Sequence, residues 1–178
     1  MRDQYNVVLI GPMGAGKTSI GKALAREINW EFHDSDQVIE ERAGVEILWI
    51  YDLEGEEGFH QREKKVIADL MQKRNIILAT GGSTVAIDEN RQAIKKHGVI
   101  IYLCTSLDDQ LVRTGYSKKR PLSTEIEERR SILKRLHDEY VPLYEGLADI
   151  IYNTDHKSTH NAVADLVKLI REKNPSLV

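Results

Sequence analysis

The chain has 178 residues, of which 41% are apolar and 30% are charged, and its formal net charge is -3 at neutral pH. This length predicts one domain, over residues 1–178, and the small net charge indicates no nucleic-acid or membrane partner. No apolar run approaches the ~18 residues of a membrane-spanning helix, the first residues lack a signal-peptide layout, and a single cysteine, Cys104, excludes an intramolecular disulfide. We therefore expect a cytoplasmic α/β protein.

Short β-branched runs alternate with longer amphipathic stretches along the chain. The strand candidates are 6–10, 31–33, 75–79, 99–103 and 149–152, and the helical candidates are 17–28, 36–50, 56–73, 88–97, 106–114, 124–140 and 158–172. Near-continuous apolar strands that are separated by helices are typical of a parallel sheet covered on both faces. The sequence therefore predicts a five-stranded parallel sheet with helices on each side.

A glycine-rich turn follows the first strand candidate. Its residues read GPMGAGKT and fit the P-loop pattern G-x4-G-K-[ST] between a strand and a helix. Glycines let backbone N–H groups converge on phosphate oxygens, and the following helix adds a favourable dipole. We expect Lys17 to reach the β- and γ-phosphates of ATP and the Thr18 hydroxyl to bind Mg2+. The other nucleotide-binding candidates are Gly11, Met13, Gly14, Ala15, Gly16 and Ser19.

Two acids stand where the second strand candidate ends. Asp34 and Asp36 are two residues apart, so in extended chain they face the same way, at the strand end where open α/β sheets bind ligands. One carboxylate can hold Mg2+ through water, and the other can orient a substrate hydroxyl and accept its proton. A simpler role is also open, because Asp36 or Ser35 can cap the following helix.

Two further segments have the composition of ligand-binding loops. Gly81, Gly82 and Ser83 follow the third strand candidate, where paired glycines allow a ligand to approach the backbone closely or simply form a tight turn. Residues 115–124, GYSKKRPLST, contain three cations and little apolar surface. The second segment predicts a loop that closes over the site.

Taken in order, these features make the chain resemble the shikimate kinase family over about residues 6–170. The shared letters are the P-loop, D-x-D at 34–36, G-E-x-x-F at 55–59, the glycine turn at 81–82, R-T-G at 113–115, R-P-L at 120–122 and P-L-Y at 142–144. The resemblance implies a three-layer P-loop kinase fold with a five-stranded parallel sheet, a lid at about 114–124 and a small helical substrate-binding subdomain at about 36–62. It also implies a monomer that uses ATP and Mg2+ to phosphorylate the 3-hydroxyl of shikimate, a small-molecule acceptor from aromatic amino acid biosynthesis.

The resemblance also implies roles for individual residues. Asp34 matches the acid of the magnesium site, and Asp36 matches the acid that binds the substrate hydroxyls. Arg120 matches the lid arginine that reaches the phosphates, and Arg113 matches the arginine that lies along the adenine. Lys17, Asp36 and Arg120 are then the expected catalytic residues.

The chain departs from the family pattern on the acceptor side. The family holds the carboxylate of shikimate with two arginines, and this chain has His60 and Tyr140 at those positions. The third-strand turn ends in Ser83 in place of glycine, and the lid motif ends in Ser123 in place of leucine. Histidine is only partly cationic near neutral pH and lacks the forked donors of arginine. Loss of two arginine contacts would weaken binding by about 3–6 kcal/mol.

His60 and Tyr140 can also have purely structural roles. The departures from the family pattern leave three functions open. Tyr140 shares a helical face with Leu133 and Leu136, as a core residue would, and His60 fits an exposed helix position. The chain can be a shikimate kinase with an altered pocket, a kinase of another polyol or cyclitol without a carboxylate, or a nucleotide-binding module without turnover. The predicted acceptor site comprises Asp36, His60, Gly81, Gly82, Ser83 and Tyr140.

Overall fold

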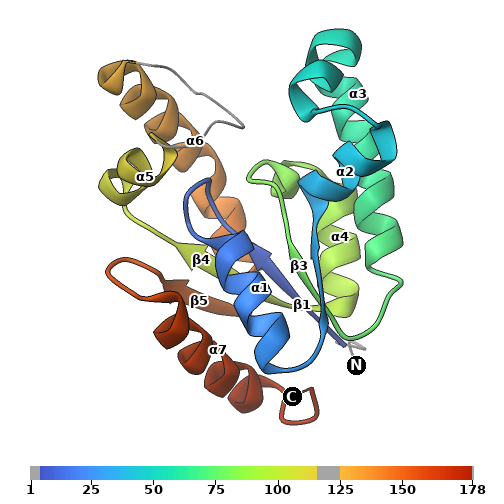
Figure 1. Cartoon of the computed structure of the whole chain (residues 1–178), viewed down its shortest axis with the longest axis vertical. Helices are drawn as coiled ribbons and strands as arrows, with labels where there is room; N and C mark the ends of the chain where they lie inside the picture. Colours follow the sequence, from blue (N-terminus) through green and yellow to red (C-terminus); the bar gives the residue numbers. More distant parts are fainter. Residues whose placement is uncertain (1–4, 116–124, 178) are drawn as a thin grey trace.

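The computed structural model describes residues 5–115 and 125–177 and shows a central sheet flanked by helices (Figure 1). The elements are β1 (Asn6–Ile10), α1 (Lys17–Glu27), β2 (Glu31–Asp34), α2 (Ser35–Ala43), α3 (Ile47–Leu70), β3 (Ile76–Ala79), a 3-10 turn η1 (Thr84–Ala86), α4 (Asp88–His97), β4 (Gly98–Cys104), α5 (Leu107–Thr114), α6 (Ile126–Leu147), β5 (Ile150–Asn153) and α7 (Thr159–Lys173). Arg120, Ser123 and most of the predicted lid lie outside the described residues. None of the helices in the described ranges is long and apolar enough to cross a membrane.

The five strands form one sheet in the order β2-β3-β1-β4-β5. Every neighbouring pair is parallel, and Val8 of β1 lies opposite Leu78 of β3 and Ile100 of β4. The predicted five-stranded parallel sheet is therefore confirmed. Because the strands are parallel, the loops that follow β1, β2 and β3 emerge at the same edge of the sheet.

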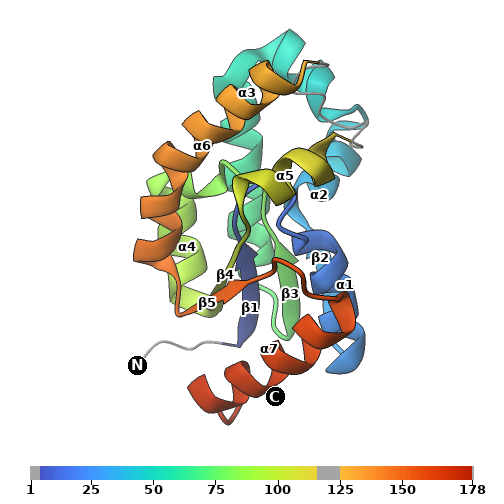
Figure 2. The same ribbon diagram turned by 90° about the vertical axis from the view of Figure 1, so that its left-hand side faces the viewer.

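The side chains of β1 alternate between two buried layers. Val8 and Ile10 pack in a cluster with residues of α3, α4 and α6, whereas Val7 and Leu9 pack against residues of α1 and α7. Figure 2 shows α4 and α6 on one side of the sheet and α1 and α7 on the other. Both faces of the sheet are covered, as the apolar strands predict.

The helices after β2 are divided differently from the prediction. The sequence pattern predicts one helix over 36–50, but α2 ends at Ala43 and α3 begins at Ile47. Gly44 adopts φ +70°, the left-handed conformation in which glycine commonly ends a helix. The predicted gap before residue 56 is reduced to a kink at Gly55, whose φ of +69° and ψ of -173° are not helical.

Helix α6 is longer than its predicted end at residue 140. It continues through Pro142 to Leu147, although proline cannot donate the backbone hydrogen bond that a helix interior requires. The extra turns bury Tyr144 and Leu147 in the cluster on the α3 and α4 side of the sheet. Burial of these two side chains accounts for a helix that local propensity alone would end earlier.

Candidate active site

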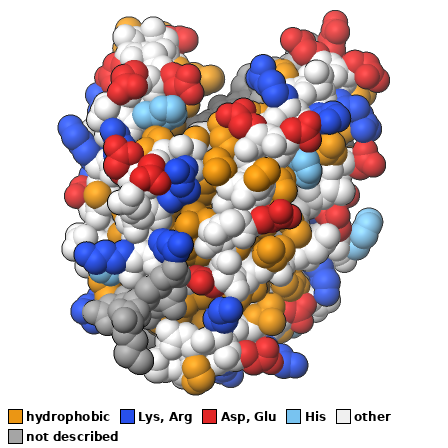
Figure 3. Space-filling view, turned by 180° about the vertical axis from the view of Figure 1, so that it is seen from behind, with side chains coloured by type: hydrophobic (Ala, Val, Ile, Leu, Met, Phe, Trp, Pro, Cys, Tyr) orange, Lys and Arg blue, Asp and Glu red, His pale blue; other side chains and the backbone are white. Residues whose placement is uncertain are grey.

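A pocket of about 670 Å³ opens where β1, β2 and β3 end, between the first part of α3 and α6. The space-filling view shows the molecule hollowed between these two arms, with acidic side chains on both (Figure 3). The predicted site residues that line the pocket are Met13, Gly14, Gly16, Lys17, Thr18, Ser19, Asp34, Asp36, Gly81, Gly82, Ser83 and Tyr140. Four other predicted residues, Gly11, Ala15, His60 and Arg113, do not line it in the part of the chain that the structure describes.

The P-loop forms the floor of the pocket. Gly11 has φ +140°, and a Cβ atom there would lie 2.3 Å from the carbonyl oxygen of Leu103, so only glycine fits. Gly16, with φ +90°, precedes α1, whose first residue is Lys17. The Lys17 ammonium donates hydrogen bonds of 2.7 and 2.8 Å to the carbonyl oxygens of Gly11 and Pro12. The loop thus combines an ammonium group with a helix N-terminus, which is a suitable arrangement for an anion.

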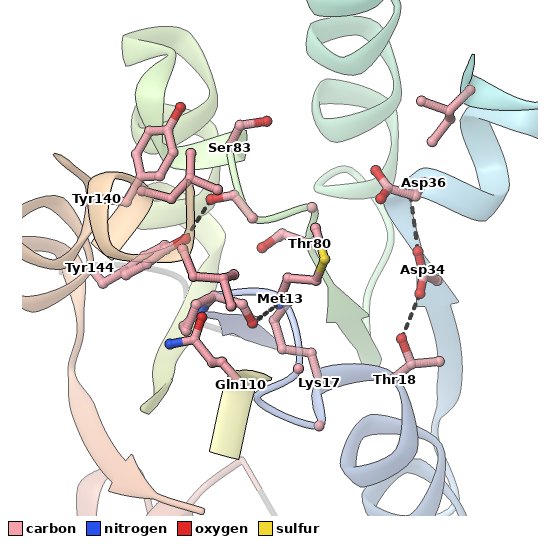
Figure 4. Close-up of a pocket in the computed structure, with 18 of the residues that line it drawn as sticks. Met13, Lys17, Thr18, Asp34, Asp36, Thr80, Ser83, Gln110, Tyr140 and Tyr144 are labelled. Carbon is pink, nitrogen blue, oxygen red and sulfur yellow. Dashed lines mark hydrogen bonds between the residues drawn. The ribbon is translucent and has the colours of Figure 1, made fainter. Parts of the chain in front are cut away.

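The Asp34 carboxylate connects α1, the helix that follows the P-loop, to the start of α2 through hydrogen bonds. Its Oδ2 atom accepts a hydrogen bond of 2.8 Å from the Thr18 hydroxyl, and its Oδ1 atom accepts from the N–H groups of Asp36 at 3.0 Å and Gln37 at 3.3 Å (Figure 4). Asp34 is therefore the N-cap of α2, and the alternative that Ser35 or Asp36 provides the cap is wrong. These contacts hold one carboxylate beside a hydroxyl, both oxygen groups that suit Mg2+.

The turn after β3 is packed against Asp36. The Gly81 N–H donates to the Ser35 hydroxyl at 3.1 Å, and a Cβ atom on Gly81 would lie 2.9 Å from Asp36 Oδ1. On the other side of the turn, the Tyr144 hydroxyl donates to the Gly82 carbonyl at 2.5 Å. Figure 4 shows Asp36 and Tyr140 on opposite sides of the pocket, with Ser83 near Tyr140. The turn thus spans the space between the two predicted acceptor-binding walls.

A buried polar cluster lies next to the turn after β3 and holds the residue that follows it, Thr84. Glu63 of α3 is fully buried and accepts hydrogen bonds from the Thr84 hydroxyl at 3.2 Å and the Asn90 side chain at 3.5 Å. Asn90 also donates to the Thr84 carbonyl at 3.2 Å. This cluster could not be predicted from the sequence, because Glu63 stands in a run of charged residues that is typical of a solvent-exposed helix face.

Arg113 lies at the nucleotide end of the site. Its Nη1 atom donates to the Gly14 carbonyl at 2.9 Å, and Nη2 donates to the Thr154 carbonyl at 3.4 Å and lies 3.6 Å from Asp109 Oδ2. The guanidinium group therefore connects the P-loop to α5 and to the loop after β5. Its predicted contact with adenine stays a prediction.

Helix α6 supplies the wall opposite Asp36. Leu133, Leu136, His137, Tyr140 and Tyr144 all line the pocket, which agrees with the helical face that the sequence indicates for three of them. The Tyr140 ring also packs against the core, and its centroid lies 6.3 Å from that of Tyr144. Burial raises the pKa of the Tyr140 hydroxyl, and the carboxylates of Glu139 and Glu56 raise it further.

His60 lies beside the pocket. Its side chain is 21% exposed, and its Nε2 atom is 3.8 Å from Oε1 of Glu56, which does line the pocket. Arg62, two residues later, donates hydrogen bonds of 2.8 and 2.7 Å to the two carboxylate oxygens of Glu54. On α3 the pocket wall thus presents the carboxylate of Glu56, and Arg62 is paired with a different carboxylate, that of Glu54.

The pocket also contains residues that were not predicted from the sequence as members of the site. They are Ile47, Leu48, Tyr51, Glu56, Thr80, Gln110, His137 and Tyr144. Glu56 and Tyr144 belong to recognisable patterns, the G-E-x-x-F and P-L-Y letters. The others are brought together by the packing of α3, α5 and α6 around the ends of the strands.

The chain is similar to shikimate kinases in both sequence and structure. The shikimate kinase family model matches residues 13–171. A shikimate kinase from Legionella pneumophila (strain Corby) is 56% identical over 160 residues, 90% of each chain, and one from Vibrio parahaemolyticus is 46% identical over 173 residues, 97% of this chain and 100% of the other. The solved shikimate kinase from Acinetobacter baumannii, in complex with shikimate, has a TM-score of 0.91 and 36% identity, with 97% of this chain and 96% of that chain covered.

Proposed function

This chain belongs to the shikimate kinase family, and we propose that it transfers the γ-phosphoryl group of ATP to a hydroxyl group of shikimate. The observation that supports this most directly is the shared pocket. It holds the P-loop residues Lys17 and Thr18 at one end and Asp36, packed against Gly81, at the other. A nucleotide and a hydroxyl acceptor can therefore meet in one cavity, whose volume is ordinary for small-molecule sites.

The nucleotide would bind at the P-loop. Its phosphates would accept hydrogen bonds from the loop N–H groups and from the Lys17 ammonium, in competition with the carbonyls of Gly11 and Pro12 that now accept from it. Arg113, beside Gly14, would lie along the base. Arg120, outside the described residues, would bring a second positive charge to the transferring group, as the motif R-P-L implies.

The donor set beside the P-loop fits Mg2+. This ion prefers one or two carboxylates together with phosphate oxygens and water, and Thr18 and Asp34 offer a hydroxyl and a carboxylate whose oxygens are 2.8 Å apart. When bound, Mg2+ supplies neutralisation of the charge on the phosphates. Thr18 would bind it directly, and Asp34 would hold it through water.

Asp36 would act on the acceptor. It would orient the shikimate hydroxyl, whose oxygen forms a bond to the γ-phosphorus while the bond from that phosphorus to the β-phosphate oxygen breaks. The hydroxyl proton would pass to the Asp36 carboxylate. Gly81, Gly82 and Ser83 would bring backbone groups to the same acceptor, and α2 with the first part of α3 would form the acceptor-binding subdomain of a single-domain monomer.

One observation favours a second candidate, a polyol or cyclitol without a carboxylate. The described pocket residues include three acids, Asp34, Asp36 and Glu56, against one lysine, Lys17, and no arginine. Acids at the acceptor end repel a carboxylate and do not repel a neutral ring. His60 and Tyr140, where the family has arginines, do not add a permanent positive charge.

The test is ADP release measured with shikimate, quinate and a panel of neutral cyclitols. We expect shikimate to be turned over at sub-millimolar concentration and Lys17→Ala to lose turnover with the fold retained. Turnover of a neutral cyclitol and not of shikimate would establish the second candidate. ATP binding without ADP release for any acceptor would refute both, and would leave a nucleotide-binding module.

A further inference from the structure

His137 is the feature of the pocket that the proposed roles leave unexplained. It lies on α6, one helical turn before Tyr140, and its side chain lines the pocket. Its Nδ1 atom is buried and has no hydrogen-bond partner in the described part of the chain. Buried polar atoms nearly always have a partner, and a structural histidine is usually oriented by the hydrogen bond that one ring nitrogen makes. The ring of His137 is not anchored through Nδ1.

The charges around the pocket make this imidazole unusual. Lys17 and His137 are the described lining side chains that can carry a positive charge, and the Lys17 ammonium is held at the nucleotide end by the carbonyls of Gly11 and Pro12. Arg62 is paired with Glu54 away from the pocket lining. Among the described lining residues on the α6 wall, His137 is thus the one whose side chain can carry a positive charge toward an anionic acceptor.

The position of His137 also fits an acceptor that is oriented by Asp36. Asp36 and Tyr140 lie on opposite sides of the pocket (Figure 4), and His137 is on the same face of α6 as Tyr140. Shikimate carries its carboxylate at one end of a six-membered ring and its hydroxyl groups toward the other. If a hydroxyl lies at Asp36, the carboxylate points toward α6. The carboxylate then faces a wall that consists of Leu133, Leu136, His137 and Tyr140.

We infer that His137 is a specificity-determining residue that donates a hydrogen bond from its imidazole to the carboxylate of the acceptor. This inference rests on the proposed function. It explains how a pocket without a described arginine in its lining accepts a carboxylate. A hydrogen bond to a carboxylate is also stronger than one between neutral groups.

Steady-state kinetics of His137→Ala, His137→Gln and a control, His160→Ala, test the inference. His160 is an exposed histidine on α7, far along the chain from the pocket residues. We expect His137→Ala to raise the KM for shikimate about 10-fold or more, the effect of losing one hydrogen bond to a charged group, with the KM for ATP unchanged. His137→Gln, which keeps a neutral donor, should recover part of the loss, and His160→Ala should match the unaltered chain.

The outcomes separate this inference from the function on which it rests. An unaltered chain that does not phosphorylate shikimate refutes the proposed function itself. Normal turnover by the unaltered chain together with a shikimate KM within twofold in His137→Ala refutes the role of His137 alone. An equal rise in the KM values for shikimate and ATP, or a lowered melting temperature that accounts for the loss, also refutes it, because a purely structural residue would behave in this way.

Discussion

The Tyr144 hydroxyl donates a hydrogen bond of 2.5 Å to the carbonyl oxygen of Gly82 and so ties α6 to the turn after β3. Tyr144 is almost completely buried, and its ring stacks on that of Tyr102 with a centroid distance of 5.0 Å. The hydroxyl can therefore reach few other partners. Because Gly82 follows Gly81, which packs against Asp36, Tyr144 connects the predicted acceptor-binding turn to the opposite wall of the pocket.

Tyr144→Phe should reduce catalysis more than it reduces stability. The change removes one donor and leaves the Gly82 carbonyl without it, which costs about 1 kcal/mol of folding free energy. We expect a kcat/KM for the acceptor that is lower by about 10-fold, since a 1.4 kcal/mol loss of positioning has that effect, and an unchanged KM for ATP. Coupled measurement of ADP release gives both constants.

Tyr152→Phe is the matched control for this variant. The Tyr152 hydroxyl donates a hydrogen bond of 2.7 Å to Asp165 of α7, on the side of the sheet that faces away from the turn after β3. The same atom is removed, so a similar loss of stability is expected with normal kinetics. Equal kinetic constants for the two variants would contradict the positioning role of Tyr144.

Gly81→Ala should damage the acceptor site through a steric contact. The new Cβ atom would lie 2.9 Å from Asp36 Oδ1 and 3.3 Å from the Thr84 hydroxyl, both closer than ordinary contact allows. The carboxylate or the turn must move, and we expect kcat to fall by about 10- to 100-fold, as displacement of a reacting group by roughly 1 Å does. Fluorescence titration should show that nucleotide binding is retained.

Gly146→Ala provides the comparison for that substitution. Gly146 is an exposed residue of α6, and a Cβ atom there would meet nothing within 4 Å. Alanine in a helix is more stable than glycine by about 0.5–1 kcal/mol, so this variant should gain stability and keep its activity. A Gly81→Ala enzyme as active as Gly146→Ala would show that the turn is not held against Asp36 during the reaction.

Asp34→Asn should change the dependence on Mg2+ and leave the fold intact. Asparagine caps helices as well as aspartate does, so its oxygen can still accept from the N–H groups of Asp36 and Gln37. The negative charge beside the Thr18 hydroxyl is lost. We expect half-maximal activity to require about 10-fold more Mg2+, which is the typical effect of losing a residue that supports a metal without binding it directly. An unchanged Mg2+ titration would place the metal elsewhere.

The catalytic half of the site could be predicted from the sequence because each part of it is local. Lys17, Thr18, Asp34, Asp36 and Gly81 lie at or shortly after the carboxyl ends of β1, β2 and β3, and a parallel sheet brings such strand ends to one edge. The strands β1, β3 and β4 were predictable since nearly all of their side chains are buried on both faces, whereas β2 and β5 are partly exposed. In both cases a short stretch of sequence contains the whole signal.

The acceptor wall could not be predicted in this way because it depends on how distant helices pack. Glu56 stands just after the kink at Gly55, and Tyr144 reaches the pocket because α6 continues past Pro142. Local propensity opposes the second of these, and burial of Tyr144 outweighs it. The resemblance places His60 in the acceptor site, which stays a prediction, and the structure shows Glu56, one helical turn earlier, on the pocket wall.

Alkaline pH should lower the free energy of unfolding of this protein, because two tyrosines have raised pKa values in the folded state. Burial raises the pKa of Tyr102 to about 12, and burial together with the hydrogen bond to Asp165 raises the pKa of Tyr152 to about 12. Tyrosines in the unfolded chain titrate near 10. Between roughly pH 10 and 12 the folded state therefore binds more protons than the unfolded state, and the free energy of unfolding falls as pH rises.

Urea unfolding at pH 9 and pH 11 measures this effect. The stabilisation is complete at pH 9, below the unfolded pKa, and we expect a loss on the order of a few kcal/mol by pH 11, since each unit of pKa difference is worth about 1.4 kcal/mol. The Tyr152→Phe variant, with its hydroxyl removed, should start less stable and lose less over the same interval. Parallel losses in the two proteins would contradict a contribution from Tyr152, because a hydroxyl that has been removed cannot titrate.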